Sequence, residues 1–297
     1  MITRIAGNGP DLALIHGWGL GSAVWGPVLD ALAQRCRVHL VTLPGYGLPG
    51  SRMDQQSSPA PREEAHKQTL SGQALARTPV GAACSPAADA APTFIATAAA
   101  LAEALDDTLP AGCVLCGWSL GGMLALQTAA LAPQRVKGLI LVGSTPSFTQ
   151  RADWPHAQPS ALLDTFSAAI GADAASALQR FVALLNQGDA QARQLGRAMI
   201  KQLLANGLPD TATLLTGLGW LHDVDLRAQI ASIATPTLLI HGERDPLMPL
   251  AAAHWLEEQL PQARLEVFAG AAHAPFLADP ERFTTLVSDC CHEFYHA

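Results

Sequence analysis

Residues 117–121 read Gly-Trp-Ser-Leu-Gly, so that one serine stands with a glycine two positions to either side. The stretch follows a short apolar run and precedes a helical stretch, which makes it the pattern G-x-S-x-G between a strand and a helix. In so tight a turn a Cβ at either glycine would collide with neighbouring backbone, and the serine hydroxyl is lifted clear of the sheet. The chemistry that this arrangement allows is nucleophilic attack by Ser119 on a carbonyl carbon.

A serine hydroxyl is a weak nucleophile until a base accepts its proton and a third group orients that base. Suitable residues follow two later apolar runs. Asp245 comes shortly after the run 237–240, and His273 comes shortly after the run 265–268. The order serine, acid, histidine is the chain order of hydrolases built on this elbow. We therefore predict Ser119 as the nucleophile, Asp245 as the orienting acid and His273 as the base.

Other residues compete for these roles. Glu243 is a second acid in the same loop, but it lies closer to the strand end than Asp245, which we prefer. Ser144 also follows a strand but lacks flanking glycines, so we expect it to begin the next segment. The chain has 10 histidines, and most histidines in proteins are surface or packed residues. His273 is distinguished by its position after the final strand.

Acyl transfer through a serine passes through a tetrahedral oxyanion, which needs two backbone N–H donors. In the elbow architecture one donor is the residue after the serine, here Leu120, and the other lies in the loop after an early strand. Residues 16–19, His-Gly-Trp-Gly, form that loop, and its glycines allow close approach to a substrate. We predict Trp18 as the second donor, and we expect His16 to brace the loop.

The elements that must position these residues alternate between strands and helices. Apolar runs bounded by Gly or Pro predict strands at 12–15, 38–43, 114–116, 139–142, 237–240 and 265–268. Helical stretches lie between them, for example at 96–107, 120–132 and 251–259. This alternation predicts an α/β fold, a mostly parallel, doubly wound sheet with helices on both faces and a site at the carboxyl ends of the strands.

Two regions interrupt the alternation. Residues 144–234 have a helical pattern throughout, so we predict an inserted helical lid that divides the sheet domain into residues 1–143 and 235–297. Residues 48–92 change in composition to Pro, Ala, Ser, Gln and Gly and contain no aromatic residue. Such a segment buries too little apolar surface to offset its ordering entropy, so we predict a disordered insertion and assign it no function.

The bulk composition excludes several classes of protein. A chain of 297 residues is long enough to bury a substantial core around a cavity. Its net charge of -7 argues against a nucleic-acid partner, because phosphate binding needs a basic field. No run approaches the roughly 18 large apolar residues of a membrane-spanning helix, and residues 1–10 lack the apolar region of a secretory signal. We therefore predict a cytoplasmic protein without a membrane part.

The cysteines do not indicate a disulfide framework or a metal site. Six cysteines in a chain of this length suit free thiols in a reducing compartment. Cys113 and Cys116 form a C-x-x-C pair, but positions three apart in a strand face opposite sides, and no second ligand pair has zinc-site spacing. We predict buried thiols here. The serine mechanism requires neither a metal nor an organic cofactor.

With these residues assembled, the chain resembles the α/β-hydrolase superfamily. Within it, the chain is similar to the methyl ester esterases of biotin synthesis, which act on a pimeloyl group bound to acyl carrier protein. The stretches that carry the closer likeness are LIHGWGLGSAVW (14–25), LPGYG (43–47), CGWSLGG (116–122), RADWP (151–155), VDLR (224–227) and AAHAPF (271–276). The likeness spans nearly the whole chain except 48–92. G-x-S-x-G is shared across the superfamily, whereas the combination of HGWG, GWSLGG and AAHAPF is much more specific.

The resemblance implies the same nucleophile, acid, base and oxyanion donors, and it adds residues in the lid. It implies that Phe181 touches the acyl chain. It also implies that an acidic carrier protein is held by Arg180, Arg193 and Arg197. One further arginine of the family pattern is replaced here by Ser176.

The charges of the lid support a carrier protein as partner. Between residues 180 and 206 the charged residues are Arg180, Arg193, Arg197 and Lys201 against Asp189 alone. The last three cations are four residues apart and lie on one helix face, where they can steer an acidic partner. Taken alone, the spacing favours an ordinary solvated face, and the family resemblance reverses that preference.

The sequence therefore predicts a monomeric serine carboxylesterase that hydrolyses the methyl ester of a carrier-bound pimeloyl chain. Two alternatives stay open. A broad short-chain carboxylesterase, or another hydrolase of the same fold such as a carbon-carbon bond hydrolase or a peptidase, would differ only in its lid and pocket. A non-catalytic binding protein would belong to another class, and the intact Ser119, Asp245 and His273 argue against it.

Overall fold

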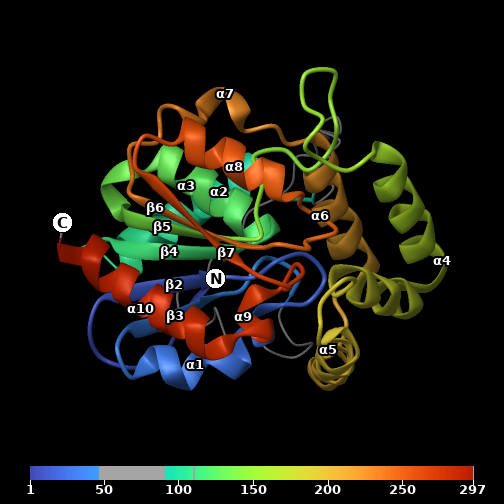
Figure 1. The fold of residues 1–297 in the computed structure, drawn as a ribbon, viewed down its shortest axis with the longest axis horizontal. Helices are drawn as coiled ribbons and strands as arrows, with labels where there is room; N and C mark the ends of the chain where they lie inside the picture. Colours follow the sequence, from blue (N-terminus) through green and yellow to red (C-terminus); the bar gives the residue numbers. More distant parts are fainter. Residues whose placement is uncertain (47–90, 110, 297) are drawn as a thin grey trace, which may run out of the picture. The chain divides into compact units, whose positions relative to one another are not determined.

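A seven-stranded sheet lies at the centre of the part of the chain that the structure, a computed structural model, describes: residues 1–46, 91–109 and 111–296 (Figure 1). Its strands are β1 (Ile2–Ala6), β2 (Asp11–Ile15), β3 (Arg37–Val41), β4 (Cys113–Trp118), β5 (Val136–Val142), β6 (Thr237–Gly242) and β7 (Ala263–Phe268). Their order across the sheet is β1-β3-β2-β4-β5-β6-β7. The expectation of disorder at 48–92 falls, apart from the last two residues, outside the described residues.

Strands β2 to β7 pair in parallel, and β1 pairs with β3 antiparallel at one edge. Every residue of β2, β4 and β6 is buried, as expected for strands that are covered on both faces. The predicted mostly parallel sheet is confirmed. The sequence reading missed β1, because this five-residue edge strand, Ile-Thr-Arg-Ile-Ala, has neither an apolar run nor a regular alternation of polar and apolar residues.

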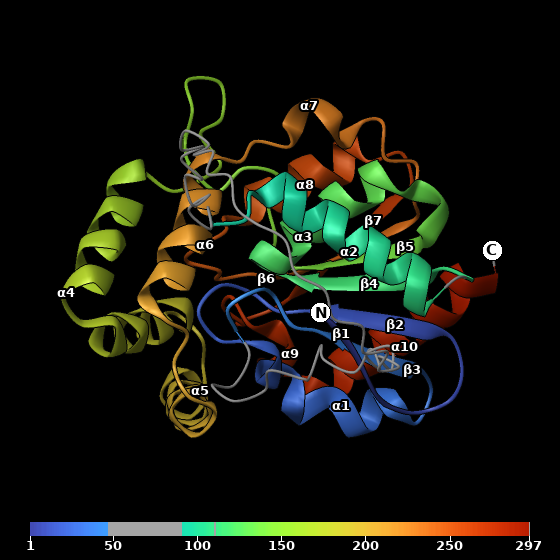
Figure 2. The same cartoon turned by 180° about the vertical axis from the view of Figure 1, so that it is seen from behind.

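Helices cover both faces of the sheet. Figures 1 and 2 show α2 (Phe94–Thr108), α3 (Leu120–Leu131) and α8 (Leu250–Gln259) on one face, and α1 (Gly26–Ala33) and α10 (Pro280–His296) on the other. The short α9 (Pro275–Ala278) directly precedes α10. Helix α2 begins where the hydroxyl of Thr93 accepts a hydrogen bond from the Ala96 amide at 3.1 Å, which satisfies one of the free N–H groups of the first turn.

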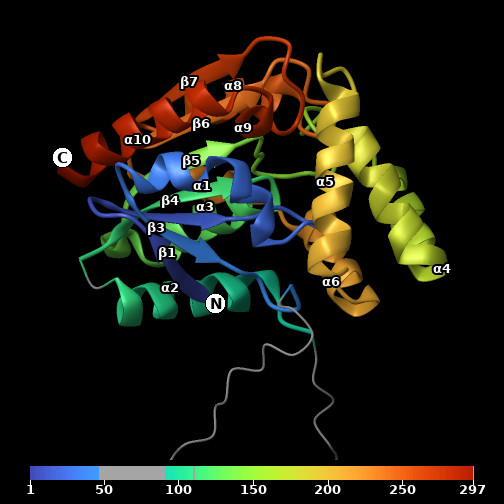
Figure 3. The same cartoon turned by 90° about the horizontal axis from the view of Figure 1, so that it is seen from below.

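The helices between β5 and β6 are α4 (Ser160–Leu185), α5 (Ala192–Asn206), α6 (Thr211–Asp223) and α7 (Arg227–Ile230). Figures 1 and 3 show α4, α5 and α6 together beside one end of the sheet strands, whereas α7 lies apart from α4. We propose 144–234 as the lid segment, with α4 to α6 as its body.

Helix α4 has 26 residues and is long and apolar enough, by length and composition alone, to cross a membrane, with a mean hydropathy of 1.3 over an 18-residue window. The sequence reading did not expect such a helix, because alanines rather than large apolar residues supply much of that hydropathy. The helix is not straight: Asp173 interrupts it with φ -157° and ψ 95°. Its buried residues, such as Leu178 and Val182, belong to the common hydrophobic core.

Candidate active site

The turn at Ser119 is a strained elbow between β4 and α3. Ser119 has φ 58° and ψ -122°, and among the described residues it alone combines a positive φ with a side chain. A Cβ on Gly117 would strike the backbone of Gly121, and a Cβ on Gly121 would strike the Ile15 carbonyl oxygen. The steric reason predicted for the two glycines is therefore confirmed. Strain of this kind is typical of functional sites.

Asp245 and His273 lie together, with the ring of His273 5.5 Å from that of Trp118, the residue before Ser119. The Nδ1–H of His273 donates a 2.7 Å hydrogen bond to Oδ2 of Asp245. The other carboxylate oxygen, Oδ1, accepts hydrogen bonds from the amides of Leu247 at 2.9 Å and Met248 at 2.8 Å. These bonds fix the carboxylate, and because Nδ1 carries the proton, Nε2 of His273 carries the lone pair.

The charge state of this pair follows from its surroundings. Burial alone would raise the pKa of Asp245, but its interactions with His273, with His241 and with the Met248 amide together outweigh burial and hold that pKa below the ordinary value of 3.8. Burial lowers the pKa of His241. Its Nε2 donates to the Met248 carbonyl oxygen at 2.7 Å and lies 3.6 Å from Oδ2 of Asp245. Asp245 is thus a carboxylate beside a neutral His241.

The competing acid and the competing serine occupy other positions. The carboxylate of Glu243 accepts a hydrogen bond from the Gly270 amide at 2.7 Å and is exposed. The hydroxyl of Ser144 donates to the carbonyl oxygen of Ser119 at 3.1 Å, so that Ser144 supports the backbone of the elbow. The structure therefore places Asp245, rather than Glu243, on His273.

Every polar atom of His273 except one is held by the protein. Its carbonyl oxygen accepts from the indole N–H of Trp118 at 2.8 Å, and its amide donates to the Leu185 carbonyl oxygen at 3.1 Å. Its Nε2 is buried and has no hydrogen-bond partner in the described part of the chain, Ser119 included. The structure thus orients the imidazole and leaves Nε2, the nitrogen that a base would use, without a partner. In free enzymes catalytic hydrogen bonds are often long and tighten only when substrate binds.

The loop that follows β2 lies against Ser119, the candidate nucleophile. A Cβ on Gly17 would be 3.1 Å from the Cβ of Ser119. The backbone N–H groups of Trp18 and Leu120 have no acceptor within the described chain. Both are therefore available to an oxyanion that forms at Ser119.

Two side chains brace this loop. His16 donates from Nδ1 to the Gly17 carbonyl oxygen at 2.8 Å and accepts the Leu43 amide on Nε2 at 3.1 Å. Burial lowers the pKa of His16 to about 4, so it is neutral near pH 7 and is fully used by these two bonds. The Tyr46 hydroxyl accepts from the Gly19 amide at 2.9 Å. These contacts are the bracing that was expected of His16, and Tyr46 was not foreseen.

The side chain of Trp18 ties the same loop to the lid. Its indole N–H donates to the Leu214 carbonyl oxygen in α6 at 2.9 Å, and its ring meets Phe181 of α4 edge-to-face, with 4.7 Å between centroids. Phe166 completes the cluster, 5.9 Å from Phe181. A Cβ on Gly217 would lie 2.5 Å from the indole, so this glycine makes room for Trp18. Phe181 therefore lies beside the loop that carries the candidate oxyanion donor.

The four cations expected to hold a carrier lie on α4 and α5. Arg180, Arg193, Arg197 and Lys201 are all exposed. None forms an ion pair with an acidic residue of the described chain. Their charges are thus open to a partner.

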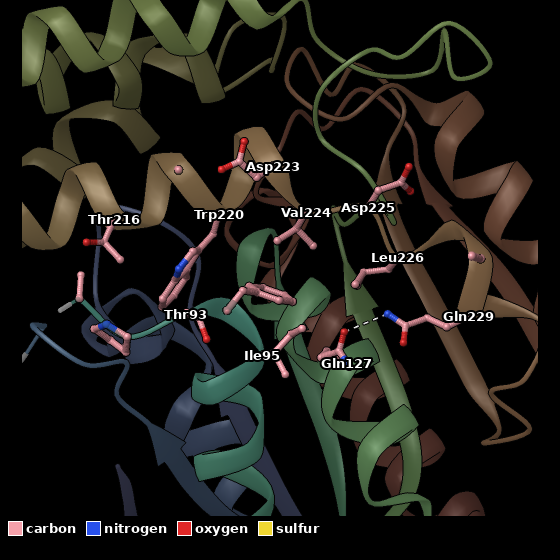
Figure 4. Close-up of a pocket in the computed structure, with 15 residues that line it drawn as sticks. Thr93, Ile95, Gln127, Thr216, Trp220, Asp223, Val224, Asp225, Leu226 and Gln229 are labelled. Carbon is pink, nitrogen blue, oxygen red and sulfur yellow. Dashed lines mark hydrogen bonds between the residues drawn. The ribbon is translucent and has the colours of Figure 1, made fainter.

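A large cavity of the described structure lies away from the candidate catalytic residues. It has a volume of about 870 Å³ and lies between the start of α2, the end of α6, and α7 (Figure 4). Its apolar lining includes Phe94, Ile95 and Trp220. On one side the side-chain amide of Gln229 donates a 2.9 Å hydrogen bond to the side-chain oxygen of Gln127. None of the three candidate catalytic residues lines this cavity, so it is not where the candidate chemistry takes place.

The thiols of β4 are buried as predicted. Cys113 and Cys116 are free and fully buried, and burial raises the pKa of both. Over residues 1–46, 91–109 and 111–296, no group of three or more His, Cys, Asp or Glu side chains is placed to hold a metal ion. That the reaction needs no cofactor stays a prediction.

The fold and the site define the chain as an α/β hydrolase, and the sequence model of the alpha/beta hydrolase fold matches residues 12–280. The pimeloyl-[acyl-carrier protein] methyl ester esterase of Nitrosomonas europaea is 38% identical, and the match covers 94% of each chain. The enzyme of the same name from Aeromonas hydrophila subsp. hydrophila is 36% identical, with 95% of each chain covered. The chain therefore belongs to the alpha/beta hydrolase fold family and, within it, to the family of these esterases.

Solved structures share the fold at lower sequence identity. An esterase from Exiguobacterium antarcticum superimposes with a TM-score of 0.75 at 22% identity, covering 97% of this chain and 94% of that one. A bromoperoxidase from Bacillus anthracis gives a TM-score of 0.74 at 18% identity, covering 96% and 92%. Because their names differ in chemistry, the fold alone does not choose the reaction.

Proposed function

We propose that this protein is a serine carboxylesterase that hydrolyses the methyl ester of pimeloyl-[acyl-carrier protein] during biotin synthesis, releasing methanol and a free carboxylate. The names of relatives that are 33–38% identical over most of the chain support the substrate. The observation that carries the chemistry is the buried 2.7 Å hydrogen bond between His273 and Asp245, with Nε2 of His273 left without a partner in the described chain. The strained Ser119 directly follows Trp118, whose ring centroid lies 5.5 Å from that of His273.

In the acylation half-reaction, Nε2 of His273 accepts the proton of the Ser119 hydroxyl as Oγ attacks the ester carbonyl carbon. The oxyanion that forms is stabilised by the N–H groups of Trp18 and Leu120. When the tetrahedral intermediate collapses, the ester C–O bond breaks, and the methoxide takes the proton from His273 and leaves as methanol. In deacylation, His273 removes a proton from water, which attacks the acyl-enzyme and regenerates the Ser119 hydroxyl.

Asp245 makes the proton transfer feasible in a buried site. Imidazolium at His273 would be costly without a fixed counter-charge, because burial disfavours an isolated cation. The carboxylate of Asp245 is oriented by two amides and lies directly on Nδ1. It therefore stabilises the imidazolium and keeps Nε2 facing the reaction.

Selectivity must come from the lid, because the thioester that joins the acyl chain to its carrier is also an activated acyl group. We place the apolar chain along the aromatic cluster of Trp18, Phe166 and Phe181, which reaches from the candidate oxyanion loop into α4. A chain bound there with its carrier outside the lid would present its distal methyl ester, rather than the thioester, to Ser119.

The carrier itself is proposed to dock on α4 and α5 through Arg180, Arg193, Arg197 and Lys201. The chain as a whole carries a net charge of -7, so an acidic partner needs a local positive surface to approach it. These four exposed cations without ion-pair partners in the described chain provide one. We further propose that the protein acts as a cytoplasmic monomer.

The decisive experiment supplies the gene to a biotin-requiring strain that lacks its own esterase, with the wild type and Ser119→Ala side by side. Methanol release from the carrier-linked methyl ester is then measured on the purified proteins. Wild type should restore growth, and Ser119→Ala should lose turnover by about 10⁴-fold or more. Ser144→Ala is the matched serine control and should lose far less. Growth and turnover near wild type in Ser119→Ala would refute the mechanism, and hydrolysis of free esters alone would refute the substrate.

A further inference from the structure

The turn between α4 and α5, residues 186–191, contacts both loops that carry the candidate acid and base. The carbonyl oxygen of Leu185, the last residue of α4, accepts the His273 amide at 3.1 Å. The carboxylate oxygen Oδ2 of Asp189 accepts the Ala272 amide at 3.1 Å. On the other loop, Arg244 donates to the Gly188 carbonyl oxygen at 3.2 Å. The end of α4 and the turn after it thus bind two backbone amides of the loop that carries His273, and they meet the loop that carries Asp245 through the Arg244 side chain.

Asp189 is unusual within its surroundings. It is the single acidic residue between Arg180 and Asn206, a stretch that also carries the cations Arg193, Arg197 and Lys201. A residue of a solvated face would point outward, but this carboxylate is partly buried and is directed to the Ala272 amide. Its second oxygen, Oδ1, accepts the Gln191 amide at 2.7 Å, which fixes the rotation of the carboxylate.

The two bonds of Asp189 have different consequences. The bond to the Gln191 amide closes the turn locally and accounts only for the structure of the lid. The bond to the Ala272 amide joins residues that are 83 positions apart and ends on the residue directly before His273. Since the remaining bonds of His273 are to Trp118, Leu185 and Asp245, the loop that carries it has one charged contact from the lid, and Asp189 supplies it.

We propose that Asp189 is a positioning residue for the reaction: through the Ala272 amide it holds the loop that presents Nε2 of His273 to Ser119. The inference rests on the proposed function, because it requires His273 to be the base. A hydrogen bond from an amide to a carboxylate is stronger than one between neutral groups. A misplacement of about 1 Å in a catalytic group can cost about 100-fold in rate, so a small drift of this loop is enough to matter.

The test measures hydrolysis of a short p-nitrophenyl ester, which needs no carrier protein. In Asp189→Ala, kcat should fall by about tenfold to 100-fold while KM changes by less than about twofold. The matched control is Asp164→Ala, which removes the same charge from an exposed position on α4 and should leave kcat unchanged. Thermal unfolding of both variants is recorded to compare their stability.

The conservative variant distinguishes positioning from general stability. Asp189→Asn keeps one carbonyl oxygen, which can accept from Ala272 or Gln191 but not from both, so its kcat should lie between wild type and Asp189→Ala. If Asp189→Ala fails to fold, Asp189→Asn carries the test. The low-field proton resonance of His273 Nδ1–H should shift or broaden in both Asp189 variants and stay unchanged in Asp164→Ala.

A wild-type kcat in Asp189→Ala, or an equal loss in Asp164→Ala, would overturn the inference. Ser119→Ala is measured in the same assay to separate this from the proposed function. If Ser119→Ala stays active, the serine mechanism fails. If Ser119→Ala is inactive while Asp189→Ala and Asp189→Asn match wild type, only the positioning role of Asp189 fails.

Discussion

Asp245 and His273 are joined by a 2.7 Å hydrogen bond between two side chains that are both 0% exposed, 28 residues apart in the chain. A buried carboxylate is tolerated only when hydrogen bonds replace the water that it has lost. Asp245 receives three, one from the imidazole and two from backbone amides. The pair is therefore assembled before any substrate arrives.

Asp245→Asn should remove the charge while it nearly preserves the shape, and we expect kcat to fall by about 10⁴-fold because the imidazolium loses its counter-charge and the imidazole its preferred tautomer. Steady-state kinetics on a small ester measure this loss. Glu243→Gln is the matched control in the same loop and should retain activity, because its carboxylate contacts the Gly270 amide rather than His273. A greater loss in Glu243→Gln than in Asp245→Asn would assign the acid role to Glu243.

Two glycines of α6 predict opposite effects of the same substitution. A Cβ on Gly217 would lie 2.5 Å from the indole of Trp18, whereas a Cβ on Gly219 would meet nothing within 4 Å. Alanine is favoured over glycine inside a helix by about 1 kcal/mol, so Gly219→Ala should stabilise the protein and preserve activity. Gly217→Ala should displace Trp18 and lower kcat by about tenfold or more. Urea unfolding and ester hydrolysis on both variants check this, and equal activities would show that the position of the Trp18 side chain does not matter.

Carrier docking predicts a loss that depends on the substrate. Arg193→Gln with Arg197→Gln removes two positive charges from the exposed face of α5, and kcat/KM on carrier-linked substrate should fall by about tenfold or more, most strongly at low salt. Activity on a small free ester should stay within about twofold, because that ester does not contact α5.

The control for this experiment is Gln134→Glu with Gln259→Glu, which changes the net charge by the same amount at two exposed positions outside the lid helices. It should affect neither substrate. Equal losses on carrier-linked and free esters in the α5 variant, or the same loss in the control, would contradict docking on this face.

The central features of the fold could be predicted because local sequence encodes them. Short apolar runs marked β2 to β7, and G-x-S-x-G marked the turn at Ser119, where a Cβ on either glycine would strike neighbouring backbone. Strand β1 was not predicted, because this short edge strand has no such run. The placement of Asp245 and His273 could be predicted because both follow strands whose carboxyl ends meet at one edge of a parallel sheet.

The supports of the site could not be predicted, because their contacts join distant parts of the chain. The indole of Trp118 binds the carbonyl of His273 across 155 positions, and that of Trp18 binds the carbonyl of Leu214 across 196. From the sequence Asp189 was only one negative charge among several cations, yet its carboxylate binds the Ala272 amide. Spacing reveals which residues share an element, but it does not reveal which backbone amide a side chain will reach after the lid folds back.

The buried histidines predict how stability depends on pH. Burial lowers the pKa of His16 from 6.5 to about 4, so between these values the unfolded chain binds a proton that the folded chain does not. Stability must therefore fall as the pH is lowered from 6.5 towards 4, by up to about 3 kcal/mol for this one group. His241, whose pKa burial also lowers, adds to the same slope. Asp245 has a pKa below its ordinary 3.8, so the stability it contributes is lost only at still lower pH.

Urea unfolding of wild type and His16→Gln, measured at intervals between pH 7 and pH 4.5, checks this expectation. The variant loses the bonds to Gly17 and Leu43 and should be less stable at pH 7. Its stability should nevertheless fall less steeply on acidification, since one proton-linked group has been removed. The test is the slope of the unfolding free energy against pH, not its absolute value. Similar dependences of that free energy on urea concentration would show that both proteins undergo the same transition. An unchanged slope in His16→Gln would mean that His16 is already protonated in the folded protein, which is incompatible with an Nε2 that accepts the Leu43 amide.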